Sequence, residues 1–508
     1  MQDVDDNDFY KAENMAEYLE EYVNDHEYSG VALAKRIQFG AEVNGVEEYN
    51  EGWRINFRVA SKANTISSQK LIVATGSTSV PNMPALRGQN AFEGPIIHTL
   101  DYGRSKIFDR HDIKSVAVIG GGKSAADMVY QNIKLGRQVS WIIRSSGKGP
   151  GAFLDVKMKL GSVRNAADLA YVRFAASLLA FPGLQPASYW QSFLYTTRLG
   201  AWVFRKWRNL LNTMMLGSAN YDNRPGAKAG FKDLKSSIDA VALESPTGIK
   251  HHEDFWDVIA QNVDVYRVDI DHLEAGKIVF MDGGKIEVDA ILCGTGFKDT
   301  IPFFTEKQCI QYGLPHSISA EPIELQKEWA ELNRGAQKAV DARFYSITPP
   351  LATPPTDKLG DVDLQQAPFR LYNCIAPITS SFPSSSRRNL AFVGFATLTN
   401  MFASSELCAI YATAYLDGTI TLPSEQEVKK DIAYVTTYMR TRCPTYGRTG
   451  NYYICDFHQF IDRIMDEVGL SSYRKGWWKE GTEPLVMSDL RGLRREYIEK
   501  YSAREERT

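Results

Sequence analysis

The sequence predicts an α/β protein, and three neighbouring segments carry this prediction. Residues 115–119 form a short apolar run that is typical of a buried strand. The run enters a glycine-rich loop at residues 120–125, and a helical pattern follows over residues 123–135. Residues 138–144 form the next apolar run. The order strand, helix, strand is that of a βαβ unit, which places parallel strands side by side in a Rossmann-like sheet.

Hydrophobic spacing predicts further elements on both sides of this unit. Helices are expected at residues 14–26 and 403–416, and in an amphipathic tail at 425–505. Strands are expected at residues 37–43, 53–59, 70–76 and 389–394, and around a Gly283-Gly284 hairpin turn at 277–281 and 286–292. We interpret the irregular residues 147–250 as an insertion of helices and loops in the nucleotide domain.

Size and charge restrict the class of protein. The chain has 508 residues, of which 44% are hydrophobic and 23% charged, so two or three domains are expected. The formal net charge of -3 gives no field of one sign that would hold nucleic acid or an anionic membrane. No apolar run approaches the roughly 18–20 residues of a membrane helix, and the acidic N-terminus does not read as a secretory signal. The expected location is therefore the cytoplasm.

The phosphate loop, residues 120–125, reads Gly120-Gly121-Gly122-Lys123-Ser124-Ala125 and fits the pattern GxGxxA between a strand and a helix. In this pattern the first glycine permits a tight turn, the second lets the backbone approach a pyrophosphate, and the small third residue lets the helix pack on the strand. The N–H groups and the dipole at the helix start favour phosphates. We therefore assign all six residues to cofactor binding. A side chain at Gly120 or Gly122 is expected to abolish binding without disturbing the fold.

The strand after the loop distinguishes between the two nicotinamide cofactors. A protein that binds NAD usually has Asp or Glu at the end of this strand to hold the ribose hydroxyls. Here the strand ends in Arg144, Ser145 and Ser146. A guanidinium and hydroxyls suit the 2′-phosphate of NADPH instead. We therefore assign Arg144 and Ser145 to cofactor binding and expect NADPH.

Three further motifs surround this unit. They are Ala74-Thr75-Gly76 after a strand, FxGxxxHxxx(Y/F) at residues 92–102 with His98 and Tyr102, and Cys293-Gly-Thr-Gly-Phe297 after a later strand. In this order and spacing the motifs resemble those of the flavin-containing monooxygenases over roughly residues 14–420. The tail resembles that of fungal members. The resemblance implies two dinucleotide-binding domains with Rossmann-like parallel sheets, FAD and NADPH as cofactors, and flavin contacts at Thr75 and Gly76. It makes His98 a hinge residue and not a proton carrier.

The resemblance divides the chain into four expected segments. These are a partial FAD-binding domain (1–110), an NADPH-binding domain with the insertion (111–297), a return to the FAD domain (298–420) and a helical C-terminal segment (421–508). The first GxGxxG, which holds FAD in this family, is not found in residues 1–70. We therefore expect the chain to begin within the flavin domain and to hold FAD weakly on its own. It would be a truncated gene model, one part of a split enzyme or a relative that has lost FAD, and the first is favoured.

The resemblance also implies an activity. An enzyme of this kind uses NADPH, FAD and O2 to insert one oxygen atom into a small organic substrate, here in secondary metabolism. Tyr102 favours a hydroxylating or heteroatom-oxidising member, because Baeyer–Villiger monooxygenases have Trp at this position. No catalytic side chain and no metal ligand is assigned, since the flavin carries the chemistry.

Two other functions are weighed against this one. The first is a pyridine-nucleotide disulfide reductase, and the lack of a CxxC pair among the six cysteines argues against it. The second is an NADP-binding remnant or a non-catalytic nucleotide-binding protein without flavin activity. Flavin absorbance of the purified protein distinguishes this second function from a monooxygenase.

Overall fold

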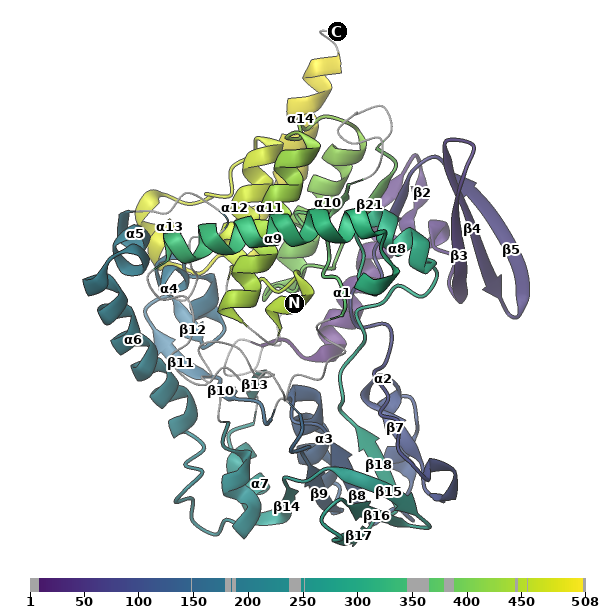
Figure 1. The fold of residues 1–508 in the computed structure, drawn as a ribbon, viewed down its shortest axis with the longest axis vertical. Helices are drawn as coiled ribbons and strands as arrows, with labels where there is room; N and C mark the ends of the chain where they lie inside the picture. The colour runs from purple at the N-terminus through teal and green to yellow at the C-terminus, as the bar shows by residue number, and fades with distance from the viewer. Residues whose placement is uncertain are drawn as a thin grey trace.

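The computed structural model describes residues 9–505 except 148, 179–183, 185–188, 237–247, 251, 345–364, 379–387, 444–445 and 455. Figure 1 shows two lobes, with the N-terminal helix α1 (Ala12–Asp25) near their junction. The lower lobe contains a parallel sheet, and the upper lobe contains the long helices of the C-terminal half with an antiparallel sheet at its side. Helix α1 confirms the helix predicted at residues 14–26.

The lower lobe is built on a five-stranded parallel sheet in the order β14-β9-β8-β18-β7. Its strands are β7 (Ile96–His98), β8 (Ser115–Ile119), β9 (Gln138–Ile142), β14 (Val263–Tyr266) and β18 (Ala290–Cys293). Helix α3 (Lys123–Lys134) connects β8 to β9, and α7 (Phe255–Asn262) precedes β14. The predicted βαβ unit is confirmed. Because β7 supplies an edge strand, this sheet begins before residue 111, the boundary expected from the sequence.

Apolar side chains from the sheet and its helices form the core of this lobe. Those that are at most 1% exposed include Val116, Val118, Ala126, Trp141 and Ile259. Strands of a parallel sheet are buried on both faces, so they read as continuous apolar runs without alternation. This is why a local pattern sufficed to locate β8 and β9.

An antiparallel sheet of β15 (Ile270–Glu274), β16 (Lys277–Phe280) and β17 (Lys285–Glu287) lies beside the parallel sheet (Figure 1). Strands β16 and β17 form the predicted hairpin, and Gly283 in its turn has φ +86°. The strand predicted at residues 286–292 is wrong as one element, because it is divided between β17 and β18. At the break, the Asp289 carboxylate accepts hydrogen bonds of 2.8 Å from the N–H groups of Lys114 and Ser115 and so directs the chain into the parallel sheet.

The upper lobe contains one three-stranded sheet and several two-stranded ones. Strands β6 (Leu71–Val73) and β21 (Leu390–Phe392) pair in parallel, and β3 (Ala41–Tyr49), β4 (Gly52–Val59) and β5 (Lys62–Ser68) form an antiparallel sheet. The predictions at residues 53–59, 70–76 and 389–394 are confirmed, and β3 begins later than residue 37. Strand β5 was not predicted, because all its residues are exposed and show no apolar alternation. Two short pairs complete the lobe: β1 (Glu27–Tyr28) with β2 (Val31–Ala32), and β19 (Leu371–Tyr372) with β20 (Ala376–Pro377).

Helices form the remainder of the upper lobe. They are α8 (Glu306–Tyr312), α9 (Ile323–Arg343), α10 (Met401–Leu416), α11 (Glu425–Arg442), α12 (Phe457–Val468), α13 (Trp477–Thr482) and α14 (Leu493–Glu505). Helix α9 contacts α11, and α10 contacts α12 (Figure 1). The helix predicted at residues 403–416 and the helical tail are confirmed. In the part of the chain that the structure describes, no helix has the length and apolar character needed to cross a membrane.

The expected insertion contains more than helices and loops. Its helices are α4 (Arg173–Ser177), α5 (Tyr189–Thr196) and α6 (Arg198–Gly217). In addition, β10 (Phe153–Asp155) pairs in parallel with β13 (Gly248–Lys250), and β11 (Lys157–Leu160) pairs with β12 (Val163–Asn165). These strands are too short to show alternation in the sequence.

A buried polar cluster attaches the insertion to the C-terminal helices. Arg173 of α4 donates hydrogen bonds to Asp462 of α12 at 2.7 Å and to Glu480 of α13 at 2.6 Å. Beside it, the Nε2 atom of His458 lies 2.9 Å from the backbone oxygen of Tyr171, so this nitrogen carries the proton. Burial, assisted by the positive charge of Arg173, lowers the pKa of His458 to about 3.

Acid is expected to destabilise the folded chain through His458. The pKa of this ring is lower in the folded chain than in the unfolded chain, where it is about 6.5. Between that value and about 3 the unfolded chain therefore binds a proton that the folded chain does not, and stability falls as the pH falls. At pH 4.5 the loss amounts to roughly 2–3 kcal/mol of unfolding free energy.

Urea unfolding at pH 7 and pH 4.5 measures this loss. The variant His458→Gln retains an amide donor for the Tyr171 oxygen and cannot titrate, so it should lose less stability than the wild-type chain by that amount. Equal losses in both chains would contradict the burial of a neutral imidazole at this position.

Candidate cofactor site

The phosphate loop lies at the carboxyl end of β8, where the parallel sheet meets the first turn of α3 (Figure 1). Gly120 has φ +126°, and its N–H donates to the oxygen of Ile142 at 3.0 Å. A Cβ atom at this position would lie 2.2 Å from the backbone oxygen of Gly294. The structure therefore requires glycine here for steric reasons alone. The expectation that a side chain at Gly120 leaves the fold intact is wrong.

Gly122 is the N-cap residue of α3. Its backbone is extended, with φ -91° and ψ -178°, and no side chain caps the helix. Its carbonyl accepts from the N–H of Ala126 at 3.1 Å, so the N–H groups of Lys123, Ser124 and Ala125 precede the first intrahelical bond. Such N–H groups, together with the helix dipole, form an anion site. The loop therefore fits a pyrophosphate.

Small residues hold the start of α3 close to the sheet. A Cβ atom on Gly294, which follows β18, would lie 2.6 Å from the Cβ atom of Ala125. Ala125 is fully buried at this contact, whereas Ser124 is exposed. The Lys123 ammonium is engaged within the helix by Asp127 at 2.7 Å. A ligand at the helix start therefore meets the backbone of Lys123 more readily than its ammonium.

The insertion forms one wall of the loop. The N–H of Gly151 donates to the oxygen of Gly121 at 2.7 Å. A Cβ atom on Gly121 would lie 2.4 Å from the backbone oxygen of Gly149. Gly121 is therefore explained by this contact between two backbone segments, without reference to a ligand.

Arg144 and Ser145 are exposed at the end of β9. The Ser145 hydroxyl donates to the carboxylate of Asp269, and the Ser146 hydroxyl donates to the same carboxylate at 2.5 Å. Burial alone would raise the pKa of Asp269, but the hydrogen bonds from both serines outweigh it and lower the pKa. The Asp269 carboxylate thus lies where the sequence analysis places the 2′-phosphate, and it already accepts hydrogen bonds from both hydroxyls.

A second arginine, Arg267, lies next to this position, and the sequence pattern did not single it out. Arg267 follows β14, which pairs in parallel with β9, so Arg144 and Arg267 follow neighbouring strands at the same edge of the sheet. Its Nη1 atom is buried without a hydrogen-bond partner, and its Nη2 atom lies 3.8 Å from the Cβ position of Gly149. A buried donor without a partner is unfavourable until an acceptor is supplied. The signal that could have identified it is its place directly after a strand of the parallel sheet.

Two extended segments that connect the lobes pair with each other. Pro81 forms a β-bridge with Phe297, and the N–H of Asn82 donates to the oxygen of Gly296 at 3.0 Å. His98 is buried, and its Nε2 atom lies 2.9 Å from the same oxygen, so Nε2 donates. The Nδ1 atom of His98 caps helix α2 (Thr99–Tyr102). These contacts support a structural role for the fingerprint histidine at the connection between the lobes.

The upper lobe offers part of a second nucleotide site. Gly76 and Gly394 follow the adjacent parallel strands β6 and β21 with φ +65° and +80°, and Thr75 is exposed beside them. The carboxyl ends of parallel strands are where nucleotides bind in such sheets. In the described residues 9–70, however, the elements are α1, short strands and an antiparallel sheet, with no strand, glycine loop and helix in succession. The residues that the structure describes therefore fit one dinucleotide at the phosphate loop. They do not form a second pyrophosphate site, which FAD would need.

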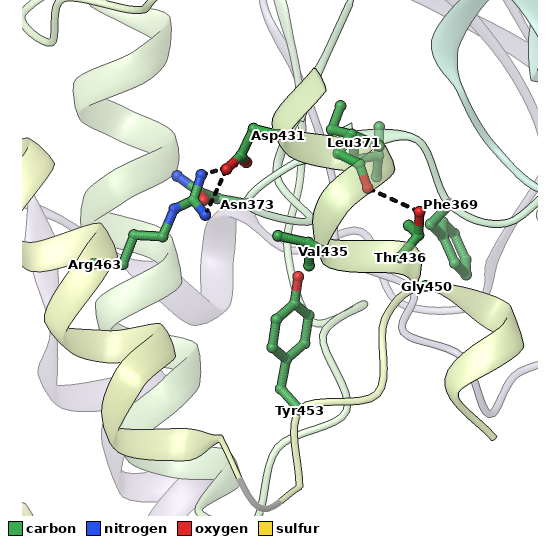
Figure 2. A pocket seen from close by; sticks show the side chains of 10 residues that line it. Phe369, Leu371, Asn373, Asp431, Val435, Thr436, Gly450, Tyr453 and Arg463 are labelled. Atoms are coloured by element: carbon green, nitrogen blue, oxygen red, sulfur yellow. Dashed lines mark hydrogen bonds and ion pairs between the residues drawn. The ribbon is translucent and has the colours of Figure 1, made fainter. Parts of the chain in front are cut away.

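One cavity in the upper lobe is too small for an organic substrate. Figure 2 shows Asn373, Asp431, Tyr453 and Arg463 around it, between β19 and the helices α11 and α12. Arg463 donates to Asp431 at 2.5 Å across one side. The volume of about 10 Å³ corresponds to one water molecule. We interpret it as the position of a structural water.

Known proteins resemble this chain over most of its length. Residues 4–160 match the profile of a family described as pyridine nucleotide-disulphide oxidoreductase. An FAD-dependent monooxygenase of Pyrenophora dematioidea is 30% identical over 432 residues, which cover 82% of this chain and 76% of that protein. The chain belongs to the FAD-dependent monooxygenases. The oxidoreductase activity and the flavin monooxygenase family predicted from the sequence are thereby confirmed.

Further comparisons agree with the assignment of this chain to the FAD-dependent monooxygenases. The FAD-dependent monooxygenase resA of Aspergillus sclerotiorum is 28% identical over 482 residues, which cover 91% of this chain and 79% of that protein. Among solved structures, cyclohexanone monooxygenase from Rhodococcus sp. Phi1 bound to NADP⁺ superposes with a TM-score of 0.53 at 14% identity, covering 90% of this chain and 83% of that one. This likeness confirms the predicted α/β fold with Rossmann-like parallel sheets, which is that of the two-dinucleotide-binding-domain flavoproteins.

Proposed function

We propose that this FAD-dependent monooxygenase takes its electrons from NADPH bound at the phosphate loop. It transfers one oxygen atom of O2 to a small organic substrate of secondary metabolism. The observation that carries the proposal is the position of Arg144 and Arg267 after neighbouring strands, next to an α3 N-terminus that no side chain caps. The NADP⁺ in the cyclohexanone monooxygenase structure supports the choice of cofactor.

Two groups of residues would bind two different parts of the dinucleotide. The N–H groups of residues 123–125 would bind the pyrophosphate, which the missing side chain of Gly122 admits. Arg144 and Arg267 would flank the 2′-phosphate with two positive charges, and the carboxylates of Asp233 and Asp269 both interact with Arg267. FAD supplies the redox chemistry when bound, and Thr75 and Gly76 are proposed to contact it.

We propose a hydroxylating or heteroatom-oxidising reaction because Tyr102 stands where Baeyer–Villiger monooxygenases have Trp. It is buried, and its hydroxyl accepts a hydrogen bond of 2.8 Å from the amide of Asn132 on α3. Tyr102 would therefore influence the reaction through the position of α3, without touching the substrate.

Removing Arg144 is expected to change the preference between the cofactors. Arg144→Ala should weaken NADPH about tenfold to a hundredfold, because a charge-assisted contact is commonly worth about 1.5–3 kcal/mol, and should leave NADH almost unchanged. Calorimetric titration with both cofactors measures this. Arg495→Ala, on the exposed side of α14, is the matched control that should change neither affinity.

The variant Asp269→Asn tests the same cofactor preference by removing a negative charge instead of a positive one. Removing a carboxylate beside the proposed 2′-phosphate should strengthen NADPH several-fold. A loss of NADH affinity at an unchanged NADPH affinity would mean that Asp269 holds the ribose hydroxyls and that NADH is the cofactor. Flavin absorbance that stays with purified residues 1–508 would exclude the alternative of an NADP-binding protein without flavin activity.

A further inference from the structure

The nine tryptophans of the chain divide into a buried set and an exposed set. Trp53, Trp141, Trp256 and Trp329 lie in the hydrophobic cores, and none of them is more than 6% exposed. The other five belong to α5, α6 and α13, and their exposed fractions are 40% for Trp190, 52% for Trp202, 36% for Trp207, 85% for Trp477 and 65% for Trp478. Tryptophan is highly buried on average, so a group of exposed tryptophans indicates an interaction surface.

Contacts with α4 connect these three helices, although α13 lies far from the other two in sequence. The rings of Phe174 on α4 and Trp190 on α5 stack with their centroids 6.5 Å apart. Arg173 of α4 donates to Glu480 of α13, and α5 contacts α6. Figure 1 shows α5, α6 and α13 along the same side of the molecule. We call the five exposed tryptophans, together with Leu199 and Leu210 of α6, the tryptophan patch.

Helix α6 is apolar on two sides. One side, which includes Ala201 and Phe204, is buried against the rest of the protein. Leu199, Trp202 and Leu210 do not belong to that side, since each of them is more than half exposed. A helix at the surface of a globular protein normally presents polar residues to solvent. In the part of the chain that the structure describes, the second apolar side of α6 is left open to solvent.

The charges of the same segment have one sign. Residues 169–221, which contain α4, α5 and α6, include no Asp or Glu, although these two types make up 61 of the 508 residues. Arg198, Arg205 and Lys206 are exposed on α6, and the Lys206 ammonium lies 6.0 Å from the centroid of the Trp202 ring. On α13, the exposed Lys479 lies 3.7 Å from Glu483. The net charge of -3 excludes a basic field over the whole chain, but it does not exclude this local excess of basic residues.

We propose that the tryptophan patch docks this monooxygenase on a lipid surface with anionic headgroups. Tryptophan rings settle at the level of the headgroups, because the ring is apolar and its N–H is polar. Leu199 and Leu210 enter the boundary of the acyl chains, and Arg198, Arg205 and Lys206 bind the anionic headgroups. A symmetric contact between two copies of the chain would place these basic residues near one another, which disfavours a second copy as the occupant.

Tryptophan fluorescence of the chain of residues 1–508 measures this docking directly. Vesicles of phosphatidylcholine and phosphatidylserine in equal amounts, with brominated acyl chains, should quench part of the emission, because bromine quenches only an indole ring that it touches. Trp202→Gln/Leu210→Gln should bind these vesicles at least about tenfold more weakly. Its unfolding midpoint should be unchanged, since both side chains are exposed. Phe39→Gln, at an aromatic residue that is 68% exposed before β3, is the matched control and should bind like the wild-type chain.

Charge variants test the anionic part of the proposal. Arg205→Gln/Lys206→Gln should weaken binding to the same vesicles about tenfold or more, and the difference from the wild-type chain should disappear at about 1 M salt. Arg58→Gln/Lys62→Gln, which removes two exposed charges from the antiparallel sheet of β3, β4 and β5, should change nothing. NADPH affinity should be the same in every variant, so a failure here is distinct from a failure at the phosphate loop.

Two results would overturn the proposal. The first is the absence of quenching by the anionic vesicles, or equal vesicle affinity in folded Trp202→Gln/Leu210→Gln. The second is a wild-type dimer that binds no vesicles and that the same variant converts to monomers, which would assign the tryptophan patch to a second copy of the chain.

Discussion

Gly122→Asp is expected to fold as well as the wild-type chain and to bind NADPH roughly a hundredfold or more weakly. Both effects originate at the N-cap of α3. Aspartate is among the preferred N-cap residues, and Gly122 already has the extended backbone that an N-cap residue adopts. The new carboxylate would accept hydrogen bonds from the first helical N–H groups and so compete with the pyrophosphate. It would also repel the negative charge of the phosphates.

Thermal unfolding and calorimetric titration with NADPH measure the two effects separately. Gly122→Asn is the matched control, since it caps the helix equally well and carries no charge. The loss of NADPH affinity should therefore be smaller for Asn than for Asp, and the difference should decrease at high salt. If folded Gly122→Asp retained the affinity of the wild-type chain, the pyrophosphate would have to bind elsewhere, and the assignment of residues 120–125 would fail.

The parts of the fold that the sequence predicted correctly depend on local patterns. Strand β8, helix α3 and strand β9 follow one another within 30 residues or so, and each buries an apolar run of its own. The division of residues 286–292 was not predictable in this way. It depends on a hydrogen bond that the Asp289 carboxylate accepts from the N–H of Lys114, which is 175 positions away in the chain. No spacing within the run itself records that contact.

The candidate site shows the same limit. The glycine pattern located the phosphate loop, and the end of the next strand located Arg144. Arg267 and Asp269 join this position only because β14 pairs with β9, and the pairing of strands that are distant in sequence has no local signal. The reason for glycine at position 121 is likewise a contact with Gly149 of the insertion. Sequence reasoning assigned Gly121 to cofactor binding, whereas the structure explains this glycine by packing.

Gly120→Ala is expected to lower the free energy of unfolding by about 4 kcal/mol or more. Two causes add at this position. The residue has φ +126°, which L side chains rarely adopt, and the new Cβ atom would lie 2.2 Å from the oxygen of Gly294, a backbone atom that cannot move away alone. Gly136, after α3, supplies the matched control because its φ is +76° and a Cβ atom there would meet nothing within 4 Å. Gly136→Ala should therefore show the conformational cost alone, about 1–2 kcal/mol.

Denaturant unfolding of the two alanine variants measures the difference, which reports the contact between residues 120 and 294. A similar loss in both variants would mean that the phosphate loop can move away from Gly294, and the steric explanation of Gly120 would then be wrong. If the difference is found, weak NADPH binding by a Gly120 variant cannot be separated from local unfolding of the loop. A change at Gly122, where the backbone conformation accepts any L residue, then becomes the substitution that tests ligand binding in a folded chain.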